Sequence, residues 1–199
     1  MTADSAPLRD DERRALLRLA RTAIEDRLLA DHRLDRAIAE VDVTPTLARP
    51  AGLFVTITDT RDRARPLRGC VGTMRGSKPL YLEVAETARA AAFDDPRFPP
   101  LACDELPRVR LAISILSALR PAPDWRAIRP GIDGVQLVRE AKRAVFLPQI
   151  AVAQRWDREQ LLTQLALKAG LAADGWRSAE LFVFRTDSFE EPDAAHSGG

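Results

Sequence analysis

The sequence predicts a globular fold that mixes helices and strands. At 199 residues the chain is long enough to bury a substantial core, as one domain or as one domain with a modest second lobe. Hydrophobic residues make up 46% and charged residues 30%, which is the composition of an ordinary packed protein. Segments with helical periodicity alternate with segments rich in β-branched and aromatic residues. The core should therefore be built from both kinds of element.

Three segments carry the signals of helices. From residue 10 to about 32, apolar residues recur at three- and four-residue steps behind an acidic first turn. A second helix is expected from about 79 to 93, where an acidic, Pro-containing segment ends it. The third begins at Asp157, with Gln160 three residues later as in a capping box, and Gly170 supplies a left-handed end.

Strands are predicted where β-branched and aromatic residues cluster between turn signals. The two strands around Glu140-Ala141-Lys142 are predicted to form a hairpin with a short polar connection. A Pro- and Gly-rich connection between 117 and 135 cannot be helical and is a candidate hinge between lobes. The expected strands are residues 53–58, 67–74, 109–117, 135–138, 144–147 and 181–185.

Charge and hydropathy narrow the function classes. Lys and Arg number 30 against 29 Asp and Glu, so the net charge of +1 offers no global field for phosphate backbones or anionic lipid. Nucleic-acid binding is therefore not expected. No segment approaches the roughly 20 apolar residues that cross a bilayer, and the N-terminus lacks a signal-peptide pattern. A cytoplasmic protein without a membrane association is predicted.

The sequence lacks the motifs of several common chemistries. The phosphate loop, the dinucleotide-binding glycine motif, the serine-hydrolase elbow and Cys-x-x-Cys are all absent, and no cofactor is expected. Cys70 and Cys103 are too few for a disulfide framework and are interpreted as free thiols. With His32 and His196 as the two imidazoles and no ligand spacing, no metal site is expected.

The main candidate for chemistry is Leu67-Arg68-Gly69-Cys70-Val71-Gly72. Residues two apart in a strand share a face, so Arg68 and Cys70 should project together. A guanidinium within about 4 to 6 Å would lower the pKa of Cys70, while Gly69 and Gly72 would let a ligand or another backbone approach closely. In the alternative interpretation Cys70 is a small buried hydrophobe, the glycines mark a bulge, and Arg68 pairs with a carboxylate.

A catalytic Cys70 would need a base, and the sequence offers little material for one. His32 ends a predicted surface helix and His196 lies in a predicted frayed tail, so a structural role for the thiol is favoured.

A second unusual segment contains three prolines, Asp95-Pro96-Arg97-Phe98-Pro99-Pro100. The stiff path that prolines impose would hold Arg97 in a fixed direction, which suits recognition of a carboxylate or phosphate. The alternative is that the prolines only end the preceding helix and that Phe98 fills the core, which we favour for Phe98.

Together with further segments, these residues resemble the AMMECR-type domain family, called AmmeMemoRadiSam system protein A in bacteria and archaea. The matching segments follow one order along nearly the whole chain. They are residues 16–21, 54–56, 67–72, 95–100, 105–106, 130–131, 134–135, 147–149, Trp156, 168–171 and Trp176.

The resemblance implies an α+β fold of two lobes. The larger lobe is built from both chain ends as an antiparallel sheet flanked by helices, the smaller α+β lobe is inserted, and a cleft lies between them. The AMMECR-type domain would span residues 8–190, followed by a disordered tail at 191–199. By the same resemblance, Arg68 and Cys70 would face the cleft.

The resemblance also implies a component of a multi-protein system with two partners, a Memo-like protein and a radical S-adenosylmethionine enzyme. A Cys-dependent enzyme that uses Cys70 and an RNA-modification-related protein are the alternatives, so enzymatic activity stays open. Cys70 is the candidate catalytic residue. The cleft is expected to bind a substrate or partner segment through five residues, Arg68, Gly69, Gly72, Arg97 and Glu105.

The chain departs from the family pattern at two positions. Ala166 stands near a position where members often carry Cys, which disfavours a mechanism with two thiols. The turn at 140–142 lacks the Gly expected in a tight hairpin, which touches only the strain of the turn.

Overall fold

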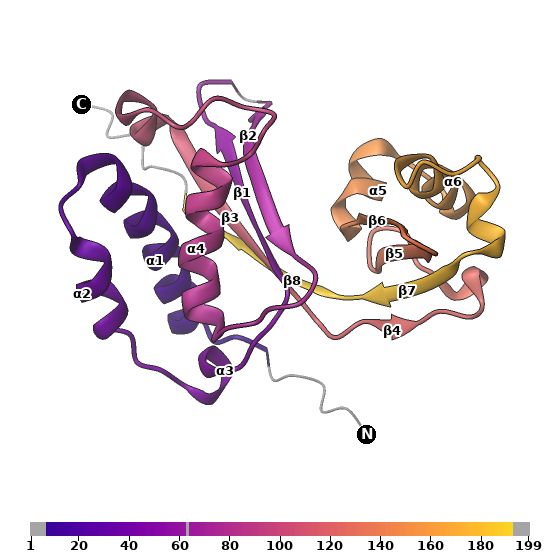
Figure 1. The fold of residues 1–199 in the computed structure, drawn as a ribbon, viewed down its shortest axis with the longest axis horizontal. Helices are drawn as coiled ribbons and strands as arrows, with labels where there is room; N and C mark the ends of the chain where they lie inside the picture. The colour runs from indigo at the N-terminus through magenta and orange to yellow at the C-terminus, as the bar shows by residue number, and fades with distance from the viewer. Residues whose placement is uncertain (1–6, 63, 193–199) are drawn as a thin grey trace. The chain divides into compact units, whose positions relative to one another are not determined.

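The computed structural model describes residues 7–62 and 64–192, which form two compact units (Figure 1). Unit 1 combines both ends of the chain, up to Ile115 and again from Asp187, and unit 2 is the segment Leu116–Thr186. The predicted domain bounds, 8–190, stay a prediction. Most of the predicted tail, including His196, lies outside the described residues.

Unit 1 is a four-stranded sheet with helices on one face (Figure 1). The strand order is β2-β1-β3-β8, and β1 is antiparallel to both β2 and β3. The strands are β1 Leu53–Asp59, β2 Leu67–Thr73, β3 Val109–Leu116 and β8 Thr186–Glu190. The helices are α1 Asp10–Leu29, α2 Arg33–Ala39, α3 Pro45–Ala48, α4 Leu80–Phe93 and the 3-10 turn η1 Cys103–Arg108.

Strict alternation in β1 separates the two faces of this sheet. Leu53, Val55 and Ile57 are fully buried in the core that contains the apolar residues of α1 and α4. Phe54 and Thr56 project from the opposite face, where the β1–β2 register sets Thr56 beside Cys70. The pairing with Thr56 therefore puts Cys70 on the face that α1 and α4 leave uncovered, whereas Arg68 is the extra residue where the β1–β2 register shifts between Ile57 and Thr58.

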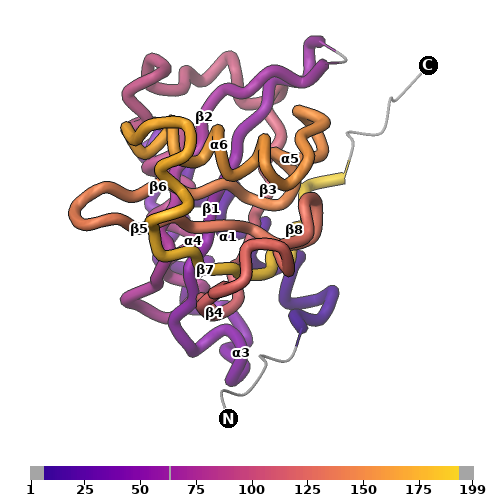
Figure 2. The backbone as a smooth tube through the Cα atoms, turned by 90° about the vertical axis from the view of Figure 1, so that its right-hand side faces the viewer, coloured from indigo at the N-terminus to yellow at the C-terminus, as the bar shows by residue number. Residues whose placement is uncertain are grey.

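Unit 2 holds a second four-stranded sheet, of order β4-β7-β5-β6, with β5 antiparallel to both of its neighbours (Figure 2). Leu137, Leu161, Leu165 and Trp176 are among the buried residues of its separate core. The strands are β4 Arg120–Pro121, β5 Gly134–Arg139, β6 Lys142–Phe146 and β7 Glu180–Phe184. The helices are α5 Pro148–Gln154 and α6 Arg158–Lys168, with the 3-10 turns η2 Trp125–Ala127 and η3 Gly175–Ser178.

The α+β class with antiparallel sheets is confirmed, as are the three predicted helices and six predicted strands. The first helix is shorter than predicted, because Ala30 and His32 adopt left-handed backbone conformations and α2 starts anew at Arg33. The capping box at Asp157 and Gln160 is present as predicted. The helices α2, α3 and α5 and the strands β4 and β8 were not predicted.

The β5–β6 hairpin turns through Glu140 with a φ of 57°. A side chain in this region costs free energy that glycine avoids, so the missing Gly leaves local strain at the predicted place. Gly170, by contrast, ends α6 with a φ of 72°, which agrees with its predicted role.

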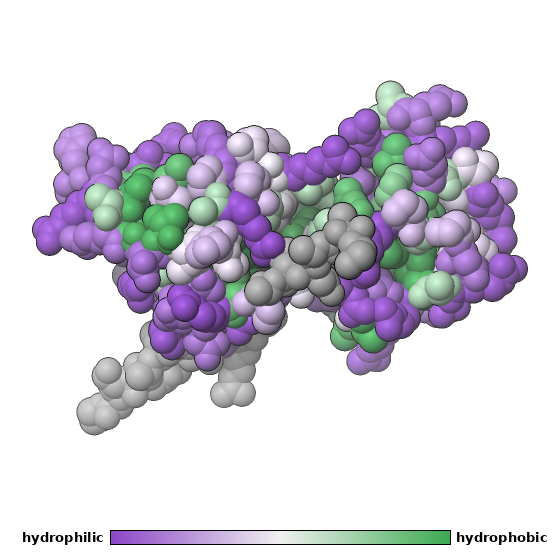
Figure 3. All heavy atoms as spheres, turned by 90° about the horizontal axis from the view of Figure 1, so that it is seen from below, coloured by the Kyte–Doolittle hydropathy of each residue, from purple (hydrophilic) through white to green (hydrophobic). Residues whose placement is uncertain are grey.

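No helix among the described residues is long and apolar enough to cross a membrane. On the face shown in Figure 3, hydrophilic side chains surround separate apolar patches.

Candidate functional site

Cys70 lies in β2, which is an edge strand of the unit 1 sheet. Its backbone groups point away from β1 and are bonded by the loop that follows α4. The Cys70 N–H donates to Asp95 Oδ2 at 2.8 Å, and Arg97 Nη2 donates to the Cys70 carbonyl at 3.0 Å. The loop therefore seals the edge of the sheet at Cys70 and fixes the position of its backbone.

Asp95 is the centre of this network, and its side chain is only 3% exposed. It also accepts hydrogen bonds from the Arg97 backbone N–H at 3.1 Å, from Nε at 2.9 Å and from Nη2 at 2.7 Å. The Arg97 side chain, together with the backbone N–H groups of Cys70 and Arg97, holds the pKa of Asp95 far below its usual range, against the opposing effect of burial. Asp95 is therefore a buried anion whose lone pairs are satisfied.

Arg97 keeps 53% of its side chain exposed although Asp95 fixes its Nε and Nη2. The same carboxylate raises the pKa of Arg97. Its Nη1 takes part in none of these bonds. The Cys70 side chain also helps to raise the pKa of Arg97, so the segment holds the guanidinium beside Cys70 while half of the Arg97 side chain stays exposed.

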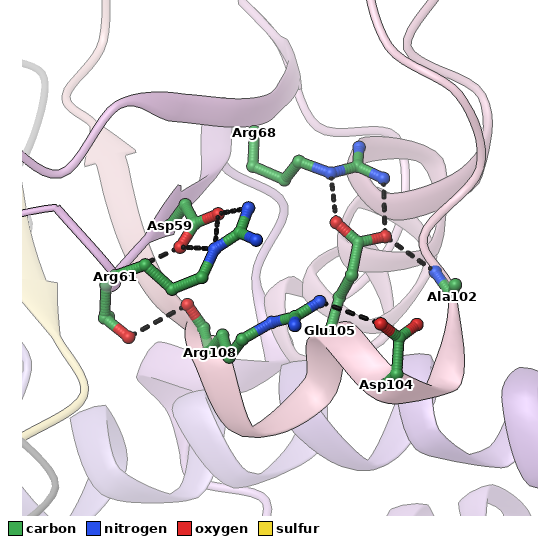
Figure 4. A network of polar contacts seen from close by, with 8 residues as sticks. Asp59, Arg61, Arg68, Ala102, Asp104, Glu105 and Arg108 are labelled. Carbon is green, nitrogen blue, oxygen red and sulfur yellow. Dashed lines mark hydrogen bonds and ion pairs between the residues drawn. The ribbon is translucent and has the colours of Figure 1, made fainter.

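Arg68 forms a bidentate ion pair with Glu105, with Nε–Oε1 at 2.7 Å and Nη2–Oε2 at 2.9 Å (Figure 4). Glu105 also accepts the Ala102 N–H at 2.9 Å, and the hydrogen bonds from Arg68 are the main cause of its lowered pKa. The Arg68 side chain is 12% exposed. The alternative interpretation, in which Arg68 pairs with a carboxylate, is confirmed. Glu105 therefore balances the positive charge of Arg68, which needs no Cys70 thiolate as a partner.

The ion pairs continue beyond Arg68 at the same end of the sheet (Figure 4). Arg61 pairs with Asp59 and lowers the pKa of that carboxyl, chiefly through side-chain hydrogen bonds. Arg108 pairs with Asp104 at 2.9 Å on η1. Charges of both signs therefore alternate here, which leaves no simple anion-binding patch.

Phe98 is partly exposed and lies near both arginines instead of filling the core. The guanidinium carbons of Arg68 and Arg97 are 5.9 Å and 5.5 Å from the ring centroid. The predicted core role of Phe98 is wrong, because the ring gains cation–π contacts at the surface. Arg68, Cys70, Arg97 and Phe98 are called the Cys70 surface below.

The two glycines of β2 serve packing. A Cβ on Gly69 would lie 2.2 Å from the Ala91 carbonyl oxygen in α4, so Gly69 permits close contact between strand and helix. A Cβ on Gly72 would lie 2.3 Å from the Phe54 ring, which lies against this glycine. Another part of the chain therefore approaches each glycine closely, as the sequence allowed, and ligand binding by Gly69 and Gly72 stays a prediction.

The Cys70 thiol is partly exposed and lies 3.4 Å from the Thr56 hydroxyl oxygen. Cys103 is exposed, with its Sγ 3.8 Å from the Leu28 carbonyl oxygen, and both thiols are free. Within residues 7–62 and 64–192, no imidazole contacts Cys70 and no three His, Cys, Asp or Glu residues are grouped to hold a metal ion. The described neighbours of the thiol thus include the Thr56 hydroxyl and the Arg97 side chain but no general base.

Comparison with known proteins decides the family. The AMMECR1 family profile matches residues 17–189. The chain belongs to the AMMECR1 family.

AMMECR1 relatives and a solved structure match over most of the chain. A protein of Aeropyrum pernix is 35% identical over 183 residues, 89% of this chain and 77% of the relative. A protein of Methanothermobacter thermautotrophicus is 36% identical and covers 90% of this chain and 93% of its own length. The crystal structure of an uncharacterised protein from Pyrococcus horikoshii has a TM-score of 0.79 at 31% identity, covering 88% and 89% of the two chains. The family is thus shown, while its biochemical function is uncharacterised.

Two residues of this AMMECR1 site were not predicted from the sequence, Asp95 and Thr56. Asp95 precedes a Pro-Arg pair, and an Asp that bonds the backbone two residues on is a known turn signal. That pattern would have predicted the Asp95–Arg97 turn. The contact of either residue with Cys70 has no local signal, because it depends on how the sheet and the loop pack.

Proposed function

We propose that this AMMECR1 protein is a binding component of a multi-protein system, and that its Cys70 surface binds a carboxylate-bearing segment of a substrate or partner. The observation that supports this proposal is the guanidinium of Arg97, which is half-exposed yet fixed by a buried carboxylate and by the Cys70 carbonyl.

A fixed guanidinium suits recognition for two reasons. Because Arg97 is already ordered, little side-chain entropy is lost when a ligand binds. Its Nη1 edge can donate to a carboxylate oxygen, and a bond of that kind is charge-assisted. Asp95 balances the positive charge of Arg97, so the surface should select by direction and shape more than by long-range attraction.

The partners come from the family resemblance. A Memo-like protein and a radical S-adenosylmethionine enzyme are the proposed partners, in the cytoplasm. Arg68 and Glu105 form an ion pair that stabilises the surface, and neither side chain offers an unpaired charge to the ligand.

A Cys-dependent enzyme is the second candidate and has less support. The thiol has the Thr56 hydroxyl and the Arg97 side chain as neighbours, and neither group takes a proton from a thiol at neutral pH. Arg68 is bonded to Glu105. No observation at this surface favours the RNA-related alternative.

Affinity measurements on an arginine variant test the proposal. Purified Memo-like protein and radical S-adenosylmethionine enzyme from the same organism are titrated calorimetrically into the wild type and into Arg97→Gln. The variant should bind at least one of them about tenfold more weakly, the loss expected for one charge-assisted hydrogen bond. A Cys70→Ser variant should bind nearly as the wild type does, because the thiol packs in this proposal and does not react.

Arg36→Gln is the matched control, since Arg36 is an exposed arginine on α2 that also pairs with a carboxylate. It removes the same charge and should leave both affinities unchanged. If Arg97→Gln retains the wild-type fold and binds both proteins as tightly as the wild type does, Arg97 is not part of the binding surface and the proposal fails.

A further inference from the structure

The net charge of +1 conceals a large difference between the two units. Unit 2 contains 11 Lys and Arg against 7 Asp and Glu, a net charge of +4, while the rest of the chain contains 19 against 22, a net charge of −3. Attraction of an anionic partner was not expected from the whole-chain charge, but it is reasonable for unit 2 alone.

Part of this positive charge lies on β6 and the adjoining hairpin. Arg139, Lys142 and Arg143 are exposed, and Arg139 pairs across the ladder with Lys142. Within the described part of the chain, none of the three forms an ion pair, although Lys142 donates to the Gly170 carbonyl. Lys168 lies beside them on α6 and donates to the Val145 carbonyl at 3.0 Å.

β6 is also an edge strand, because the order of the unit 2 sheet is β4-β7-β5-β6 (Figure 2). In an antiparallel ladder, alternate residues direct both backbone groups away from the partner strand. The two-residue turn directs the backbone N–H and carbonyl of Lys142 toward β5. The backbone groups of Arg143 and Val145 are therefore directed away from β5. The bond from Lys168 to the Val145 carbonyl agrees with this assignment.

The outward groups of Arg143 have no partner among the described residues, and neither does the Val145 N–H. The edge strand of unit 1 differs, because Asp95 and Arg97 bond both outward groups of Cys70. An open edge commonly pairs with an added strand. Pairing with β6 of a second copy would bring Lys and Arg residues together, which is unfavourable, whereas an acidic strand would be attracted.

We propose that the outer edge of β6 binds an extended acidic segment of a partner protein, which adds to the unit 2 sheet as a further strand. The backbone N–H and carbonyl of Arg143 and the N–H of Val145 would hold the segment, and Arg139, Lys142 and Arg143 would select Glu or Asp side chains. This site belongs to unit 2 and is independent of the Cys70 surface.

A synthetic peptide of about six alternating Glu and Val residues, the length of an ordinary strand, is the probe. Binding to the full chain is followed by fluorescence anisotropy and by amide chemical shifts. The peptide should bind at least tenfold more tightly than its Lys–Val counterpart and should protect the Arg143 and Val145 amides from hydrogen exchange. Arg143→Glu should abolish binding.

Two variants separate strand addition from general charge attraction. Val145→Pro removes an outward N–H without changing charge, is tolerated at a sheet edge, and should weaken binding at least tenfold. Arg120→Glu makes the same charge change on β4, at the opposite edge of the sheet, and should leave binding nearly unchanged. Equal losses in Arg143→Glu and Arg120→Glu, or wild-type binding by a folded Val145→Pro, would overturn the proposal. Tighter binding of single-stranded RNA at this edge, or self-association through β6, would overturn it too.

Discussion

At the scale of single residues, the side chain of Asp95 fixes several parts of the site at once. One carboxylate bonds the backbone of an edge strand, the backbone of its own loop and the guanidinium of Arg97. The sequence predicted a fixed Arg97 from the prolines around it, and the fixing group turned out to be the Asp two residues before it.

Asp95→Asn should destabilise unit 1 by about 2 kcal/mol at neutral pH, because charged hydrogen bonds are replaced by weaker neutral ones. The pKa of Asp95 is lower in the folded than in the unfolded chain. Its contribution to stability is therefore present above about pH 4, the ordinary pKa of Asp, and is lost as the pH falls toward the folded-state pKa. Hydrogen exchange of the Cys70 amide, at neutral pH and at about pH 3, measures both effects.

Asp94→Asn is the control, because Asp94 is exposed and its ion pair with Arg27 is long, at 3.8 Å. It should change stability by less than about 0.5 kcal/mol. If the effect of Asp95→Asn does not shrink at low pH, the carboxylate is not the group that holds the edge.

Glu140→Gly should stabilise unit 2 by about 1 kcal/mol, because Gly adopts the positive φ of the hairpin without strain. Ala141→Gly, at the next position, should give no such gain. All three tryptophans lie in unit 2, so urea denaturation followed by tryptophan fluorescence reports this change. An equal gain in both variants would show that the φ of Glu140 is not the cause.

At the scale of elements, local signals predicted the fold well. The β-branched runs became strands and the Asp157 capping box became the start of α6, since both depend on neighbouring residues. α2 was missed because it follows a left-handed His32 without a side-chain cap. β8 was missed because its sequence is polar, and its pairing depends on residues far away in the chain.

Gly69→Ala tests the packing of β2 against α4. Its Cβ would meet a backbone oxygen at 2.2 Å, which cannot rotate away, so a loss of about 2 kcal/mol is expected. Hydrogen exchange across β2 and α4 is the measurement. Gly170→Ala offers a contrast, since no atom lies within 4 Å and only its φ of 72° opposes a side chain; about 1 kcal/mol is expected there. If Gly69→Ala leaves the stability of unit 1 unchanged, β2 and α4 are not in close contact.

At the scale of the whole molecule, sequence reasoning was weakest where residues distant in the chain meet. Glu105 was predicted as a binding residue through the family resemblance, and it pairs with Arg68, 37 residues earlier. Such pairs follow from packing and have no periodic signal. The whole-chain charge likewise described neither unit, because the boundary between the units was needed to separate a basic segment from an acidic remainder.

The most direct test of the Cys70 surface uses the two thiols as reporters in one sample. Iodoacetamide labelling of Cys70 and Cys103 is followed by mass spectrometry, with and without a saturating Memo-like protein or radical S-adenosylmethionine enzyme. Cys103 is exposed, lies outside the proposed surface and serves as an internal control. A bound segment should slow the labelling of Cys70 about tenfold, equivalent to about 1.4 kcal/mol of protection, and leave Cys103 unchanged. An unchanged Cys70 rate with both proteins would contradict the proposed binding function.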